Sequence, residues 1–533
     1  MSSLFYNGTF ITMEENTPQA QAMLVDGGKI IKVGSIDDVS ACKDADTVWV
    51  DLQGRTVLPG FIDGHSHFSG LAMSLGQCDL SSAKNFEDII RLMQAFMKEN
   101  GIPDGEWVTG TNYDHNYLQE KRHPDKFVLD QISDRHPVVI IHASSHMGVA
   151  NSMGLKRQNL DESTQNPNGG RYGRLENSTQ LNGYMEESAF VRFRNAMPIP
   201  DMNSIMELFK KAQRIYAGYG ITTVQEGMVT PPLLQLLRHA QQKGIFYLDI
   251  VGYLDAESCL DMLTSGDAVA KEYDRHFRIG GCKTFLDGSP QGRTAWMKEP
   301  YAGSDDGYCG YPIKTDEQLY QIIAMAVRNN HQLLAHCNGD KAAEQYIAQV
   351  EKVLADNPTL SAVRPVMIHA QLVQREQLAR MARLSMMPSF FSAHTYYWGD
   401  IHIQNFGMER AKNISPAGTA VRLHIPFTLH QDSPVLPPNM MDTVWCAAKR
   451  ITKSGALLAQ DERISVGQAL KAATVYAAYQ YGEEAEKGKL ADGMRADFIV
   501  LDKNPLEVPM DDVRELEVLA AVKDGICVYR KSE

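Results

Sequence analysis

Short apolar runs that end in polar residues alternate, through the middle of the chain, with stretches whose apolar residues recur at helical spacing. This alternation predicts βα units and a parallel sheet. The predicted strands are residues 56–67, 222–227, 246–254, 278–288, 332–336, 365–369, 384–391 and 426–432. The predicted helices fall between them, at 202–219, 232–243, 315–329, 341–354 and 375–382. Eight such units predict an α/β fold, a (β/α)8 barrel of the TIM type.

Both ends of the chain have a different pattern, in which short β-like runs are separated by turns that contain glycine. These runs are residues 4–10, 22–25, 30–33 and 47–50 at one end, and 497–501, 517–522 and 526–529 at the other. We therefore expect residues 1–55 and 487–533 to form one discontinuous, β-sandwich-like domain. The barrel domain would then occupy residues 56–486.

The interval after the first predicted barrel strand is too long for one βα loop. It contains a helical stretch at 86–99, strand-like runs at 107–112 and 138–143, and a segment rich in Gly, Pro and Asn at 166–173 that predicts a loop. We expect residues of about 70–200 to form an inserted subdomain beside the mouth of the barrel.

The composition favours a globular protein and argues against a nucleic-acid-binding or membrane protein. Hydrophobic residues at 44% and charged residues at 22% are typical of a soluble globular chain. A net charge of -13 argues against nucleic acid as a partner, and no apolar run is long enough to span a membrane. The eight cysteines are dispersed and the N-terminus lacks a secretory pattern, which favours a cytoplasmic protein. We expect a small-molecule substrate. A homodimer is compatible with the sequence.

The chemistry begins at the end of the first predicted strand, in the segment FIDGHSHF. The period-2 spacing of His65 and His67 directs both imidazoles to the same side of a strand, as a nitrogen site for a metal requires. Lys283 lies inside an apolar strand, where an unpaired ammonium would be costly. Either it pairs with a carboxylate such as Asp287, or it is a neutral amine that reacts with CO₂ to form a carbamate ligand.

Three further residues lie at the carboxyl ends of predicted strands, which is the catalytic face of a barrel. They are His336 in LLAHCNGD, His369 in VMIHAQLV and Asp432 in FTLHQDSPV. Together with His65, His67 and Lys283 they form a complete ligand set for two divalent metals. Nitrogen and oxygen donors of this kind suit Zn²⁺, although another divalent metal is an alternative.

These segments, together with GGCKTFLDGS around Lys283 and GKLADGMRADFIVLDKNP near the C-terminus, resemble the amidohydrolase superfamily. Within it they are similar to the branch of YtcJ-like proteins and N-substituted formamide deformylases. The resemblance covers nearly the whole chain. It implies that the six residues named above are metal ligands, and that a CO₂-derived carbamate on Lys283 bridges two Zn²⁺ ions, although some members use one metal.

Several residues are candidates for catalysis or substrate contact. Asp432 is the expected proton acceptor for the attacking water, and it would then donate that proton to the leaving group. His394 is the preferred donor to the developing oxyanion, with His146 as an alternative. Arg174 and Arg293 are candidates for binding a polar or anionic part of the substrate.

The sequence thus predicts a metal-dependent hydrolase that cleaves a C–N bond of a small molecule, of the amide or N-substituted formamide type. One alternative keeps the metal-activated water but changes the bond, to that of an ester, a lactone or a deaminated ring. Another is a catalytically idle barrel that senses a ligand. The intact ligand set argues against the idle barrel.

Overall fold

The computed structural model describes residues 2–144, 146–198, 201–265, 269–270 and 272–532. The chain divides into two compact units, one made of Met1–Leu71 with Phe209–Glu533 and the other of Ala72–Leu208. Each unit has its own sheets and its own hydrophobic core.

The larger unit contains an eight-stranded sheet in which every neighbouring pair is parallel. Its strands, in spatial order, are β6 (Phe61–Ile62), β13 (Ile221–Val229), β14 (Asp249–Asp255), β15 (Phe277–Phe285), β16 (Gln332–Cys337), β17 (Val366–His369), β18 (Met387–Phe390) and β19 (Thr428–Leu429). The two outer strands approach each other, since the His67 N–H donates to the Ser433 carbonyl at 2.8 Å. The sheet therefore curls into the predicted TIM-type barrel.

Helices follow the strands where the sequence predicts them. The predicted helices are α7 (Met202–Gly218), α8 (Pro231–Gln242), α10 (Asp316–Arg328), α11 (Asp340–Asp356) and α12 (Arg375–Arg383). Three helices that were not predicted follow β19, namely α17 (Met440–Lys449), α18 (Val466–Ala472) and α19 (Val475–Tyr481). The start of α10 is fixed by a capping box between Thr315 and Gln318. Within the described residues, no helix is long and apolar enough to cross a membrane.

The predicted first barrel strand, 56–67, is two strands in the structure. Its first part is β5 (Thr56–Pro59), which pairs with the terminal strands, and only β6 belongs to the barrel. Gly60 separates them at a point of close packing, since a Cβ atom there would lie 2.5 Å from the Thr222 side chain. An apolar run alone does not reveal such a change of sheet.

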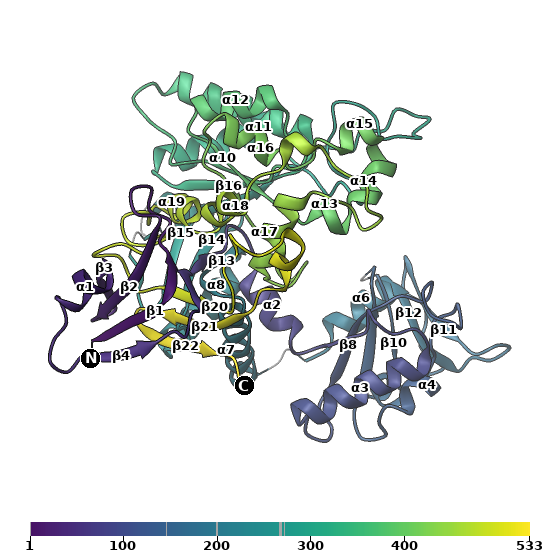
Figure 1. Ribbon diagram of the computed structural model, residues 1–533. Coiled ribbons are helices and arrows are strands. Elements are labelled where there is room, and N and C mark those ends of the chain that lie inside the picture. Colours follow the sequence, from purple (N-terminus) through teal and green to yellow (C-terminus); the bar gives the residue numbers. More distant parts are fainter. Residues whose placement is uncertain (1, 145, 199–200, 266–268, 271, 533) are drawn as a thin grey trace. The chain divides into compact units, whose positions relative to one another are not determined.

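The first and last segments of the chain build one mixed sheet, in the order β22-β21-β20-β5-β1-β2-β3, with β4 also paired to β1 (Figure 1). The early strands are β1 (Ser3–Ile11), β2 (Gln19–Asp26), β3 (Lys29–Gly34) and β4 (Val48–Asp51), and the late strands are β20 (Phe498–Leu501), β21 (Val518–Lys523) and β22 (Ile526–Arg530). The join is the antiparallel pair β5–β20, in which Pro59 lies opposite Phe498. Phe10, Val57 and Phe498 pack in the core of this sheet.

The smaller unit has a six-stranded sheet in the order β11-β12-β10-β9-β8-β7. Its elements are β7 (Cys78–Asp79), α3 (Phe86–Asn100), β8 (Val108–Tyr113), α4 (Lys126–Asp130), β9 (Val138–His142), β10 (Met147–Ala150), α5 (Ser152–Arg157), β11 (Gly170–Arg174), β12 (Leu181–Glu187) and α6 (Ser188–Asn195). Strand β11 lies partly within the predicted loop 166–173. Gly170 serves close packing there, because a Cβ would lie 2.4 Å from the Ala189 nitrogen.

A buried ion network joins the barrel to the terminal sheet. Asp249, at the start of β14, is fully buried and lies 2.7 Å from Lys487 Nζ, 3.0 Å from Lys523 Nζ and 3.3 Å from Arg495 Nη1. Burial raises the pKa of the Asp249 carboxyl, but the attraction of these cations outweighs it and holds the pKa well below its usual range. Other carboxylates share these cations, since Glu483 lies 2.7 Å from Lys487, and Asp497 and Asp524 lie 3.0 and 2.9 Å from Lys523.

Replacing Asp249 with asparagine is expected to destabilise the protein by about 1–3 kcal/mol. It removes one buried carboxylate of the network, while Lys487 keeps Glu483 and Lys523 keeps Asp497 as partners. The measurement is chemical denaturation at neutral pH. Glu409→Gln is the matched control, since Glu409 forms an exposed pair with Lys412 and such pairs contribute little. Equal stability of the two variants would contradict this account of the network.

Candidate active site

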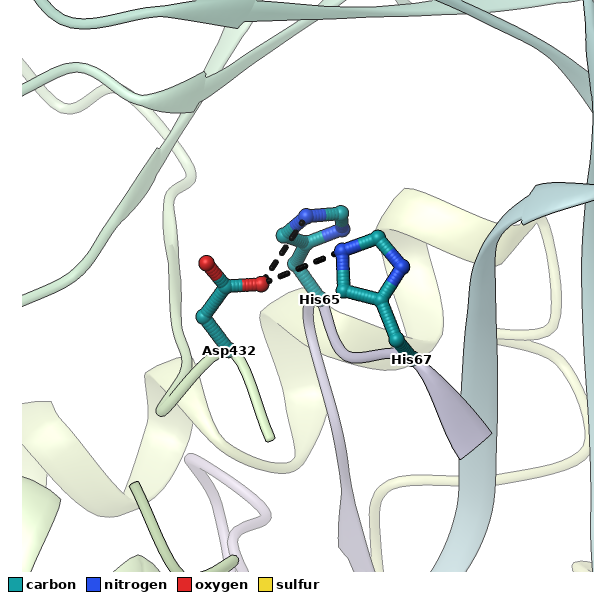
Figure 2. Close-up of side chains that lie close together, drawn as sticks. All are labelled: His65, His67 and Asp432. Atoms are coloured by element: carbon teal, nitrogen blue, oxygen red, sulfur yellow. Dashed lines mark ion pairs between the residues drawn. The ribbon is translucent and has the colours of Figure 1, made fainter. Parts of the chain in front are cut away.

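Two histidines after β6 and one aspartate after β19 form the centre of a polar cluster at the carboxyl end of the barrel strands. His65 Nε2 and His67 Nε2 each lie 3.4 Å from Asp432 Oδ1. Figure 2 shows both imidazoles directed toward that oxygen. His65 and His67 lie beyond the end of β6, so the loop after that strand, and not the alternation of a strand, directs them to the same oxygen. These three residues have the geometry of a metal-ligand group.

The backbone that holds this cluster is strained at two of its members. Asp432 has φ +57° and His369 has φ +72°, the left-handed region that non-glycine residues seldom adopt. Strain of this kind persists where the surrounding structure determines the conformation, and it is common at functional sites.

Lys283 projects into the cluster from near the carboxyl end of β15. Its side chain is fully buried, and Nζ lies 3.2 Å from His65 Nε2. Burial lowers the pKa of the Lys283 amine to about 7. The alternative pairing with Asp287 is not present among the described residues, because that carboxylate accepts N–H bonds from Trp296, Asn338 and Gly339.

The histidines predicted on β16 and β17 complete the group. His336 Nδ1 lies 3.1 Å from His369 Nε2, which is 3.9 Å from Asp432 Oδ2. Burial lowers the pKa of His336 to about 4, and it holds the pKa of His65 and of His369 well below the usual range. The structure thus brings together all six residues of the predicted ligand set.

The donors fit a divalent cation of the zinc type. The buried imidazoles are uncharged and offer lone pairs, and Asp432 adds a carboxylate. Burial raises the Asp432 pKa, but the nearby His67, His65 and His369 outweigh it and hold the pKa well below its usual range. Asp432 Oδ1 is buried and accepts no hydrogen bond from any described residue. A bound cation would satisfy this oxygen.

Residues behind the cluster orient the histidines. His65 Nδ1 donates to Gln225 Oε1 at 2.5 Å, and His369 Nδ1 lies 3.1 Å from His430 Nε2. The other nitrogen of His430 is 2.8 Å from Ser389 Oγ. Such contacts fix the tautomer and the ring orientation of a metal-binding histidine. None of these three residues has a role predicted from the sequence, although His430 lies two positions before Asp432.

His394 is buried on α13 (His394–Tyr397), stacked against His402 of α14 (Gly399–Phe406) and against Trp398. Its Nδ1 lies 2.9 Å from His402 Nε2, and His402 Nδ1 is buried with no partner among the described residues. A buried N–H without an acceptor is rarer than an acceptor without a donor. We therefore assign the His402 proton to Nε2, which leaves the proton of neutral His394 on Nε2.

The three residues predicted to contact substrate form hydrogen bonds or ion pairs with neighbouring protein groups. In the larger unit, Arg293 donates to the Ala302 carbonyl at 2.7 Å and lies over the Tyr301 ring. In the smaller unit, Arg174 donates to the backbone carbonyls of residues 162, 164 and 179. His146, also in that unit, is largely exposed and lies 3.1 Å from Glu187. Their predicted contacts with substrate remain predictions.

Comparisons with known proteins indicate one family for this chain. The model of the amidohydrolase family matches residues 48–529. An N-substituted formamide deformylase from Arthrobacter pascens is 26% identical, over 99% of this chain and 98% of that protein. YtcJ of Bacillus subtilis is 26% identical over the full length of both. The crystal structure of an uncharacterized metal-dependent hydrolase from Pyrococcus furiosus is 25% identical with a TM-score of 0.77, covering 95% of this chain and 100% of that one.

Proposed function

We propose that this chain, which belongs to the amidohydrolase family, cleaves the C–N bond of a small amide with a metal-activated water. The family and its metal-dependent structural neighbour support a hydrolase of C–N bonds. The name of one relative makes N-substituted formamides the first substrate class to test.

The observation that carries this proposal is the convergence of the six donors, in which five surround Asp432. Its Oδ1 has two imidazole nitrogens at 3.4 Å and no hydrogen-bond donor among the described residues. The residues that would hold metal are His65, His67, Lys283, His336, His369 and Asp432. When bound, zinc would supply a water that ionises near neutral pH, and zinc itself would polarise the substrate carbonyl.

Lys283 is suited to carboxylation. With a pKa near 7, a large fraction of its amine is neutral at physiological pH and can attack CO₂. A bond forms between Nζ and the carbon, one proton leaves, and the resulting carbamate has two oxygens and a negative charge. The product is a carboxylate-like ligand in place of a weak amine ligand.

Asp432 would transfer the protons of the reaction. His394 would stabilise the oxyanion by donating a hydrogen bond to it. Asp432 is ionised at neutral pH and can accept the proton of the attacking water, then donate it to the leaving nitrogen. His394 Nε2, which carries its proton in the assignment above, can donate to the developing oxyanion. His402 would act only through His394, as a positioning residue.

The test combines metal analysis with a substrate panel. The barrel site is expected to hold about one to two zinc-like ions per chain, and the protein is expected to hydrolyse N-substituted formamides or related amides in preference to matched esters. The double variant His65→Ala/His67→Ala is expected to lose at least one ion and its activity. Full metal content in this variant, measured by atomic emission, would refute the ligand assignment, and turnover of esters alone would refute the C–N specificity.

A further inference from the structure

The smaller unit has a histidine cluster of its own, at the carboxyl ends of two neighbouring parallel strands. Strands β8 and β9 pair in parallel, with Tyr113 opposite His142. The chain leaves β8 through Asp114 and His115, so both residues emerge beside His142, the last residue of β9. This cluster lies entirely within residues 72–208 and shares no residue with the six predicted metal ligands of the barrel.

The donor atoms of these three residues are spaced as ligands of one ion. His115 Nδ1 lies 3.2 Å from His142 Nε2, and Asp114 Oδ1 lies 3.4 Å from His142 Nε2 and 3.8 Å from His115 Nδ1. Zinc bonds to nitrogen and oxygen of about 2.0–2.1 Å give a tetrahedron with edges of roughly 3.3–3.4 Å. The three atoms thus approximate one face of such a tetrahedron.

The charges of the group favour a cation. Burial lowers the pKa of His142, and burial together with His115 and His142 lowers the pKa of His123 to about 4. Burial raises the pKa of Asp114, but hydrogen bonds from Asn116 and the nearby His142 outweigh it and lower the pKa overall. The imidazoles of His142 and His123 thus lie beside one carboxylate and are largely uncharged at neutral pH.

Neighbouring groups support the donors. His123 stacks on His115 with ring centroids 4.0 Å apart, and its Nδ1 is 2.9 Å from the Tyr113 hydroxyl. His142 Nδ1 lies 2.9 Å from Ser144 Oγ and accepts the Ser144 backbone N–H at 3.0 Å. Metal binding through Nε2 requires the other tautomer, in which Nδ1 donates to Ser144 Oγ and the backbone N–H turns away.

We propose that Asp114, His115 and His142 form a second binding site, for a zinc-like divalent ion, in the inserted unit. The donor set, two nitrogens and one oxygen, suits borderline metals better than Mg²⁺ or Ca²⁺. The Asp114 and His115 side chains are each about one-quarter exposed, at 25% and 26%, so an ion can enter from solvent and bind water as a fourth ligand.

The experiment counts ions on the full-length protein. Wild type and the double variant His115→Gln/His142→Gln are treated with chelator, loaded with Zn²⁺ and measured by atomic emission after gel filtration. The variant is expected to hold one ion fewer than wild type. Because only the difference is used, the result does not depend on how many ions the barrel binds.

The matched control is His239→Gln/His424→Gln, which removes two histidines outside both clusters and is expected to keep the wild-type count. Asp114→Asn preserves the turn that Asp114 forms with Asn116, and it is expected to raise the dissociation constant of this one ion at least about tenfold. Near-ultraviolet circular dichroism verifies that each variant is folded. An unchanged ion count in the folded His115/His142 variant overturns the proposal, as does an unchanged affinity in Asp114→Asn.

Discussion

Asp432→Asn is expected to retain most of the bound metal while kcat falls by about 10²–10⁴-fold, the usual contribution of general acid–base catalysis. Asparagine keeps the size of the side chain and one ligating oxygen, but its amide cannot accept a proton from water. The ligands His65 and His67 are unchanged, so metal binding should be weakened rather than abolished. Metal content, melting temperature and kcat are measured on one preparation.

A purely structural role for Asp432 predicts a different result. The melting temperature would fall, because the buried oxygen faces two histidines, while kcat per folded molecule would stay near wild type. Near-normal turnover with metal bound would therefore rule out Asp432 as the proton carrier. The wild-type kcat/KM profile should also have an acidic limb, which reports the coupled titration of the whole assembly rather than one residue.

Lys283→Ala is expected to lower activity by about 10–100-fold or more, through loss of a metal ligand. The reason is the environment of the amine, which is fully buried beside His65 and has its pKa lowered to about 7. Metal loading of the wild type should require bicarbonate if the amine becomes a carbamate. Activity is compared after loading with and without bicarbonate.

Chemical rescue separates a carbamate from a structural lysine. Short carboxylic acids should partly restore the Lys283→Ala variant by occupying the space and supplying two oxygens. The same acids should not restore Asp432→Asn, in which the missing function is proton transfer. A Lys283→Ala protein that binds metal and turns over normally would show that the lysine is not a ligand.

The sequence predicted the barrel because each of its elements carries a local signal. The buried strand β17 is apolar up to His369, and α10 combines a capping box with an apolar face, so both appear in the expected places. The ligand residues were predictable for a related reason, since His336, His369 and Asp432 follow apolar runs that end at one edge of a parallel sheet. The break between β5 and β6 depends instead on a distant contact of Gly60 with Thr222.

The residues that orient the ligands had no local signal. Gln225 reaches His65 from β13, and the His369–His430–Ser389 chain links β17 and β18 to the residue that follows β19. Partners of this kind become visible only when the strands are assembled. The same is true of Asp114, His115 and His142, which belong to no recognisable motif and meet because β8 and β9 are parallel neighbours.

The pairing of β5 between β1 and β20 has a consequence for how the protein is made. During synthesis β5 emerges from the ribosome long before the strand that covers its other edge, Phe498–Leu501. Until then the β5 edge has unpaired backbone groups, which are prone to association with other chains. Nascent chains that stall before residue 498 should therefore depend on chaperones.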